Sequence, residues 1–181
     1  MSPSDKELLA QFSDSSTKEK GYTSIIRKYQ EKLYWHIRRM VIVHADADDI
    51  LQNVFIKVWK GLENFREDSQ LYTWLYRIAT NETLSFLEKQ KKTATLSLSD
   101  LETSLENKMK ADTYFDSNQL QWRLQMAILE LPEKQRLVFN LRYYDAMPYE
   151  QMSKILDTSE GALKASYHHA AKKIEAFLKN Y

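Results

Sequence analysis

The chain has 181 residues, a formal net charge of +1 and no cysteine, which excludes a disulfide framework and a thiolate metal site. Only three glycines and three prolines interrupt a composition rich in helix-forming residues, so an all-α protein is expected, long enough for one large or two small domains. The first residues lack the order of a signal peptide, and no apolar run approaches the roughly 18 residues of a membrane span. A soluble, cytoplasmic protein without membrane insertion is therefore predicted.

The first ninety residues contain several segments with helical periodicity. Helices are predicted where apolar residues recur at helical spacing, which covers Asp5–Phe12, the segment Tyr22–Ile37, Ala47–Trp59 and Tyr72–Lys89. Gly61–Gln70 is predicted to be a loop between the last two of these helices. The region is expected to form one small helical domain at 21–92, preceded by a polar segment at 1–20.

The composition changes in residues 93–118, which are rich in Lys, Ser, Thr, Asp and Glu and poor in large apolar residues. This composition predicts a flexible linker, with transient helix at Leu101–Met109. Beyond it, a helix is predicted at Gln119–Leu131, and Pro132 is expected to open the next helix at its first position. These helices would belong to a second small domain at 119–181.

The segment Tyr149–Leu178 has the pattern of a helix-turn-helix, with a tight turn at Leu156–Ser159. One side of its second helix is apolar, and it comprises Leu163, Tyr167, Ala170, Ile174 and Phe177. The opposite side is small, polar or cationic, and it comprises Gly161, Lys164, Ala165, His168 and Lys172. Such a face can enter a DNA major groove, although an ordinary helical hairpin with a solvated face shows the same pattern.

The turn of this motif has its own chemistry. Ser159 or Thr158 is expected to cap the second helix by accepting a backbone hydrogen bond. Asp157 stands where such turns favour the left-handed region, which Asp tolerates better than most residues. Gly161 in the first helical turn costs stability, about 1 kcal/mol relative to Ala, which suggests close approach of the backbone to DNA.

The charge of the motif is small for a protein that holds DNA alone. From Tyr149 to Tyr181 the chain carries five lysines against four acidic residues. Because non-specific DNA affinity comes from Lys and Arg that neutralise phosphates, either DNA is not the partner or a larger partner supplies much of the affinity.

A second candidate region is a cluster of aromatic and cationic residues, Arg66, Tyr72, Trp74, Tyr76 and Arg77. Aromatic rings stack on unpaired bases, and arginines hold the strand that carries them. The residue types alone favour a simpler explanation, in which Trp74 belongs to a hydrophobic core and Tyr72 lies at its rim.

No metal site, cofactor or catalytic residue is predicted. Asp46–Asp49 resembles the start of a calcium loop, but the sixth position is Leu51 and the twelfth is Lys57. Asp46 or Asp48 is better explained as a cap of the following helix. His168 and His169 point about 100° apart on a helix, too far for a shared metal.

Taken together, these blocks resemble a bacterial RNA polymerase sigma factor of the extracytoplasmic-function (ECF) group. The N-terminal resemblance runs from about Tyr22 to Lys92 and rests on DADDILQNVFIKVW at 46–59 and FREDSQLYTWLYRIATN at 65–81. The C-terminal resemblance runs from about Leu120 to Leu178 and rests on LPEKQRLVFNLRYYDAMPYEQMSKILDTSEGALKASYHHA. Their order, spacing and intervening linker agree with this group.

The resemblance implies core RNA polymerase, promoter DNA and an anti-sigma factor as partners. The helix that docks on core polymerase would contribute Asp49, Leu51, Gln52, Phe55 and Ile56. The loop and helix that bind and melt the single-stranded −10 element would contribute Phe65, Arg66, Glu67, Asp68, Ser69, Gln70, Tyr72, Trp74, Arg77 and Asn81. The recognition helix for the duplex −35 element would contribute Ser159, Glu160, Gly161, Lys164, Ala165, His168 and Lys172.

Four positions depart from the pattern of the group. Asn53 replaces a common Glu in the docking helix, and Glu67 replaces a common Gly in the −10 loop. Ser166 and His169 stand where many members carry Arg, so the −35 contact is expected to depend on polymerase or on histidine protonation.

The predicted function is that of a non-enzymatic sigma factor that melts the −10 region by trapping flipped bases. One alternative is a stand-alone helix-turn-helix regulator that binds duplex DNA as a dimer. The other is a helical interaction protein that does not bind DNA.

Overall fold

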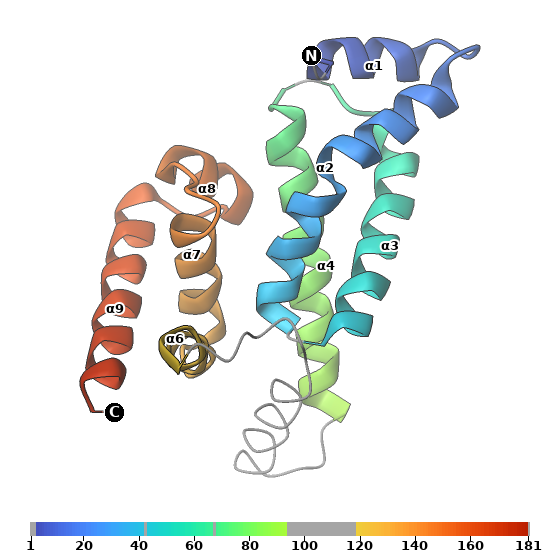
Figure 1. Cartoon of the computed structure of the whole chain (residues 1–181). Helices are drawn as coiled ribbons and strands as arrows, with labels where there is room; N and C mark the ends of the chain where they lie inside the picture. The colour runs from blue at the N-terminus through green and yellow to red at the C-terminus, as the bar shows by residue number, and fades with distance from the viewer. Residues whose placement is uncertain (1–2, 42, 67, 94–118, 181) are drawn as a thin grey trace. The chain divides into compact units, whose positions relative to one another are not determined.

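The computed structural model describes residues 3–41, 43–66, 68–93 and 119–180. Within these ranges every element is a helix, which confirms the predicted all-α fold. The chain divides into two compact units, residues 1–90 and 91–181 (Figure 1). The finer boundaries at residues 20, 92 and 118 stay predictions, and the proposed linker 93–118, with the transient helix Leu101–Met109, lies outside the described residues except for Thr93.

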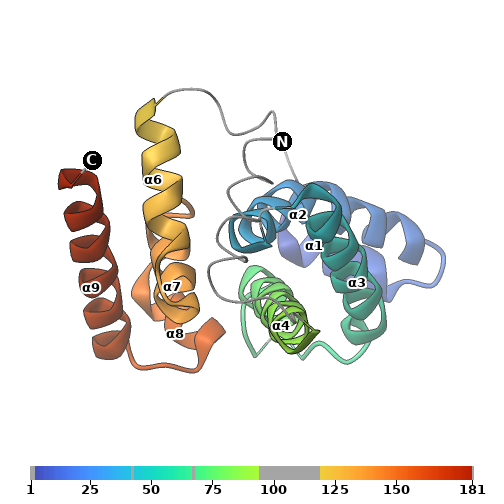
Figure 2. The same ribbon diagram turned by 90° about the horizontal axis from the view of Figure 1, so that it is seen from below.

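In the described residues, the first unit contains the helices α1 (Asp5–Ser13), α2 (Lys18–Val41), α3 (His44–Leu62) and α4 (Leu71–Thr93). Figures 1 and 2 show α2, α3 and α4 side by side, with α1 across one end. Helix α3 continues through Gly61 and Leu62, which were predicted as loop, because Leu62 is buried in the core. Helix α4 continues four residues beyond its predicted end at Lys89.

The core of the first unit draws residues from every one of these helices. The fully buried apolar side chains include Leu8, Ile25, Leu33, Ile37, Ala47, Val54, Val58 and Leu75. Tyr76 is also buried, at 1% exposure, so this member of the predicted aromatic cluster faces the core. Its ring lies 5.0 Å from the ring of His36, whose Nε2 lies 2.9 Å from the Thr80 hydroxyl.

Burial of His36, together with the nearby positive charge of Arg39, lowers the pKa of its imidazole to about 3. Removal from water disfavours the charged form of the ring. The first unit therefore contains a histidine that is neutral throughout the physiological range.

The second unit contains α6 (Gln119–Leu129), α7 (Glu133–Tyr143), α8 (Tyr149–Leu156) and α9 (Glu160–Lys179). Helices α7 and α9 lie side by side. Helix α6 ends two residues earlier than predicted, because a residue before proline disfavours the helical region. Pro132 caps α7 from outside the helix instead of occupying its first position.

The core of the second unit is a cluster of Ala127, Ile128, Leu131, Phe139, Ala170 and Ile174. Tyr167 and Phe177 are packed against it and partly buried, and Leu163 is buried as well. The apolar side predicted for the second helix of the motif therefore faces the core.

The turn between α8 and α9 has the predicted chemistry. Asp157 is left-handed, with φ 48° and ψ 47°, and its N–H donates to the carbonyl of Ser153. Ser159 is the capping residue, because its hydroxyl accepts from the Ala162 N–H at 3.3 Å. The Thr158 hydroxyl donates instead to the Leu156 carbonyl. A second left-handed residue, Ala146 at φ 49°, lies between α7 and α8 and was not predicted.

Candidate nucleic-acid interface

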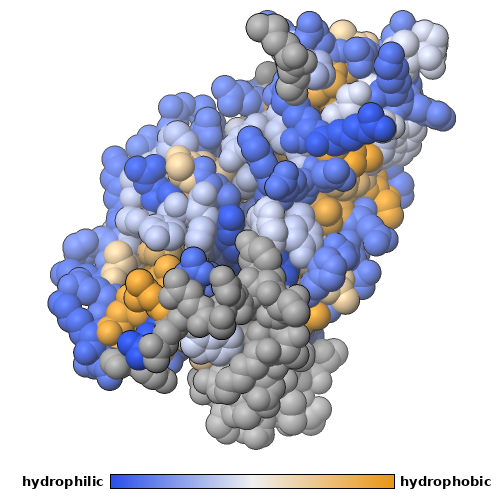
Figure 3. Space-filling model, viewed as in Figure 1, coloured by the Kyte–Doolittle hydropathy of each residue, from blue (hydrophilic) through white to orange (hydrophobic). Residues whose placement is uncertain are grey.

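The outer face of α3 is the predicted docking surface for a protein partner. Asp49, Gln52 and Ile56 are exposed at helical spacing on one face, and Ile56 is 53% exposed. Figure 3 shows hydrophobic surface in this part of the first unit. A single exposed isoleucine is common on protein surfaces, so the contact with a protein partner stays a prediction for this face.

The other two predicted docking residues do not share that face. Leu51 is partly buried, and Phe55 is only 9% exposed. The carbonyl of Phe55 accepts a hydrogen bond from the Tyr22 hydroxyl at 2.6 Å. The structure thus brings together three of the five predicted docking residues and sets the other two behind them.

The connection from α3 to α4 is the predicted −10 loop. Arg66, Asp68 and Gln70 are exposed, Ser69 is partly buried, and Glu67 lies outside the described residues. These exposed groups are available to a ligand outside the unit.

An aromatic contact closes the base of this loop. The Phe65 ring lies 5.1 Å from the Trp74 ring, at an interplanar angle of 44°. The indole also covers Gly61, where an added Cβ would lie 2.8 Å from its Cζ2 atom. Sequence reasoning missed Gly61 because it was placed in the loop and not in the helix that Trp74 contacts.

Helix α4 carries the rest of the predicted −10 residues on two faces. Trp74, Arg77 and Asn81 follow one another at helical spacing, with Arg77 and Asn81 exposed. Tyr72 lies on the adjacent face, 4.4 Å from the Tyr76 ring. Tyr72 and Trp74 are both partly buried, so they pack against the core and still present an edge to solvent.

Helix α9 presents the predicted −35 residues together. All seven are exposed, and they are Ser159, Glu160, Gly161, Lys164, Ala165, His168 and Lys172. Apart from its chain neighbours and the adjacent backbone of α9, nothing lies within 4 Å of a Cβ added to Gly161. Packing inside the unit therefore does not require glycine at this position, and the close approach to DNA stays a prediction.

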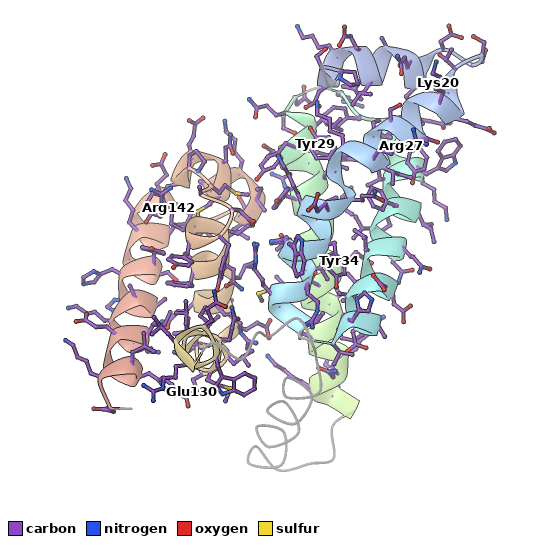
Figure 4. The ribbon with its side chains drawn as sticks, in the orientation of Figure 1. Lys20, Arg27, Tyr29, Tyr34, Glu130 and Arg142 are labelled. Atoms are coloured by element: carbon purple, nitrogen blue, oxygen red, sulfur yellow. The ribbon has the colours of Figure 1, made fainter. Side chains whose placement is uncertain are left out.

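Two residues that sequence reasoning missed lie beside this face. The Lys164 ammonium is 5.5 Å from the centre of the Tyr149 ring, and the guanidinium of Arg142 is 5.2 Å from the same ring. Figure 4 labels Arg142, which comes from α7. A cation above an aromatic ring is held by the electrons of the ring. No sequence pattern places these three groups together, because they come from three helices.

Lys164 also pairs with Glu160 one turn earlier, with 3.5 Å between Nζ and Oε2. This exposed pair contributes little to stability. A phosphate can therefore displace the carboxylate at small cost.

The residues that the structure describes contain no group of three or more His, Asp or Glu side chains that could hold a metal ion. Among them, no helix is long and apolar enough to cross a membrane.

Two family models match the chain. Sigma-70 region 2 matches residues 25–93, and Sigma-70, region 4 matches residues 121–174. Together they cover well over half of the chain, in the same order as the two compact units.

The chain is similar to known sigma factors along most of its length. The ECF RNA polymerase sigma-E factor of Escherichia coli strain K12 is 28% identical over 165 residues, which cover 87% of this chain and 86% of the relative. The RNA polymerase sigma-H factor of Pseudomonas aeruginosa is 27% identical over 168 residues, which cover 88% and 87%.

Solved structures that share the fold include two protein complexes. One is CnrH in complex with the cytosolic domain of CnrY, with a TM-score of 0.70 at 21% identity, covering 97% of both chains. The other is the sigma factor RpoE in complex with the anti-sigma factor NepR from Bartonella quintana, with a TM-score of 0.68 at 20% identity, covering 88% of this chain and 98% of the other. Both sigma regions, their order and these relatives show that the chain belongs to the ECF group of RNA polymerase sigma factors, which direct transcription initiation at promoter DNA.

Proposed function

We propose that the first unit binds both core RNA polymerase and the −10 element, and that the second unit binds the −35 element. The observation that carries this division is the match of regions 2 and 4 to two separate compact units. Each unit exposes the helix face that its role requires. The net charge of only +1 fits this division, because polymerase would supply much of the phosphate neutralisation.

The contact with polymerase is proposed on α3. Asp49, Gln52 and Ile56 are exposed and make the direct contacts. Leu51 and Phe55 act from behind, since their burial fixes the helix that presents the other three. Asn53 is exposed beside them and gives a neutral contact where many family members have a charged one.

The −10 contact is proposed at the α3–α4 connection and along α4. The exposed loop residues Arg66, Asp68 and Gln70 would hold a flipped base, with Phe65, Glu67 and Ser69 completing the loop. Base flipping lets a protein read an edge that is hidden in the duplex. Tyr72, Trp74, Arg77 and Asn81 would then hold the separated strand by stacking and by contacts to its backbone.

The −35 contact is proposed on α9. Its small residues Gly161 and Ala165 let the helix approach the major groove closely, and the flanking groups Ser159, Glu160, Lys164, His168 and Lys172 reach base edges and phosphates. Ser166 and His169 provide two fewer fixed charges than many relatives have. The affinity of this unit for isolated −35 DNA is accordingly expected to be weak.

The chain would have no chemical step of its own, because polymerase joins the nucleotides, and it would act in the cytoplasm with that enzyme. The two solved structures described above are complexes with a second protein, and one of those partners is named an anti-sigma factor. An anti-sigma factor is proposed to control this chain as well.

The test is run-off transcription with purified core polymerase and this protein on a library of genomic fragments, followed by footprinting of the transcribed fragments. The expected result is a set of promoters protected at −10 and −35 only when both proteins are present. Failure to open any promoter would contradict the proposal. Tight, specific binding of duplex DNA by the isolated chain would favour the stand-alone regulator.

A further inference from the structure

Helix α1 precedes the segment that matches region 2, which begins at residue 25, yet it is part of the core of the first unit. Leu8 and Phe12 on this helix are buried, at 0% and 4% exposure. A capping box fixes its N-terminus, because Ser4 and Glu7 bond each other's backbone N–H groups. Helix α1 is thus an ordered element with a defined first residue, Asp5.

The carboxylate of Asp5 accepts hydrogen bonds from a tyrosine in the middle of α2. The Tyr29 hydroxyl lies 2.7 Å from Asp5 Oδ1 and 2.8 Å from Oδ2. Lys28 donates to Asp5 Oδ1 at 2.8 Å and to the carbonyl of Pro3 at 2.9 Å. A hydrogen bond to a charged acceptor is stronger than one between neutral groups. Asp5 therefore fixes the hydroxyl end of Tyr29.

The ring of Tyr29 in turn supports Tyr72. The two ring centres are 6.5 Å apart at 48°, and Tyr29 is only 4% exposed. Figure 4 labels Tyr29 on α2, in the part of the unit where α1 and the start of α4 come together. Burial and the Asp5 hydrogen bond raise the pKa of Tyr29 far above its usual value, so its hydroxyl remains a donor.

Tyr72 is also supported from its own helix. Its ring lies 4.4 Å from that of Tyr76, which is buried against His36. The ring of Tyr72 is therefore held by Tyr29 from α2 and by Tyr76 from α4. A ring that is already fixed loses less conformational entropy when a base stacks on it.

We propose that Asp5 is a positioning residue for promoter opening, which acts through the hydroxyl and ring of Tyr29 to hold Tyr72 ready for an unpaired base. This inference rests on the proposed role of Tyr72 in the −10 contact. It assigns to α1, a helix ahead of the matched region, an effect on strand separation and not on polymerase binding.

The experiment compares Tyr29→Phe and Asp5→Ala in reconstituted holoenzyme. Tyr29→Phe removes only the hydroxyl and keeps the ring in place. The rate of opening on a duplex promoter is followed by permanganate reactivity of unpaired thymines. Each variant is expected to open about tenfold more slowly, the scale of one charge-assisted hydrogen bond. The double variant should be no slower than the slower single one, because both remove the same bond.

A second template separates positioning from general structure. On a promoter with a mismatched bubble already open across the −10 element, both variants should match the wild type. Glu7→Ala is the matched control, since it removes the capping box of the same helix but leaves the Asp5–Tyr29 bond. It should open the duplex promoter at the wild-type rate.

Several results would overturn the inference. They are wild-type opening by Tyr29→Phe, a deficit that persists on the bubble template, and an equal deficit in Glu7→Ala. If Asp5→Ala does not fold, Tyr29→Phe decides alone. If the wild-type holoenzyme itself opens no promoter, the proposed function fails. If the wild type opens promoters and Tyr29→Phe opens them at the same rate, only the role of Asp5 is lost.

Discussion

The two units present their candidate contacts in different ways. In the first unit, Tyr72 and Trp74 are partly buried and pack against rings of the core, so contact and support are shared by the same side chains. In the second, all seven candidate residues of α9 lie on an exposed face behind which a separate core is packed. Changes in the first unit should therefore alter stability and promoter opening together, whereas changes on α9 should alter DNA binding alone.

Trp74→Ala is expected to have the largest effect. It removes the ring that covers Gly61 and closes the loop against Phe65, and loss of a packed Trp costs about 2–4 kcal/mol of unfolding free energy when the side chain is partly buried. Denaturant unfolding should show that loss, and permanganate footprinting should show a loss of opening. If Trp74→Ala is as stable as the wild type, the claim that contact residues of the first unit also support its core is wrong.

Acidification is expected to have the next largest effect, and to act on the first unit. The unfolded chain binds a proton on His36 near the ordinary pKa of 6.5, whereas the folded unit binds it only near pH 3. The stability that this difference provides is full above pH 6.5 and declines as the pH falls toward 3. Denaturant melts between pH 7 and 4.5, compared for the wild type and His36→Gln, would measure it. If the unfolding free energy of His36→Gln falls with pH as steeply as that of the wild type, the decline in stability is due to other groups.

Lys164→Ala should separate binding from stability on α9. Because Lys164 is exposed and its pair with Glu160 is weak, the unfolding free energy should change by less than about 0.5 kcal/mol. Holoenzyme binding to −35 promoters should weaken, and the dependence of log affinity on log salt should fall by about one, the contribution of one phosphate contact. An unchanged salt slope would indicate that this lysine does not contact a phosphate.

Ala146→Gly should have a small and favourable effect on stability and no effect on DNA binding. Ala146 has a φ of 49°, which is costly for a residue with a Cβ, so glycine should stabilise the second unit by about 0.5–1 kcal/mol. Ala176→Gly, in the regular part of exposed α9, is the control and should destabilise by a similar amount. Thermal unfolding of the two variants should shift in opposite directions, and a parallel shift would contradict the strain at Ala146.

Local chemistry made part of this fold predictable. Asp157 and Ser159 were placed correctly because a left-handed turn and a helix cap each depend on a few adjacent residues. Ala146 was missed because alanine has no preference for the left-handed region, and only the tertiary path from α7 to α8 imposes it. Pro132 was misplaced by one position, an error within the usual uncertainty of a helix end.

Non-local contacts account for most of what the sequence did not predict. The bond between Asp5 and Tyr29 joins residues 24 apart, and the ring of Tyr149 meets cations from α7 and α9. Periodicity assigns each residue to a face of its own helix but does not say which face of another helix it meets. The same limit explains Tyr76, whose aromatic type fitted both a stacking role and the core.

The open space around Gly161 has a practical consequence. The chain contains no cysteine, and a Cβ added at position 161 would have open space around it. Gly161→Cys would therefore carry a single thiol, to which an environment-sensitive fluorophore could be attached without a competing label. Because Gly161 is proposed to lie against the major groove, the attached group should block that contact, so the labelled protein should fold as before and bind −35 DNA more weakly in holoenzyme.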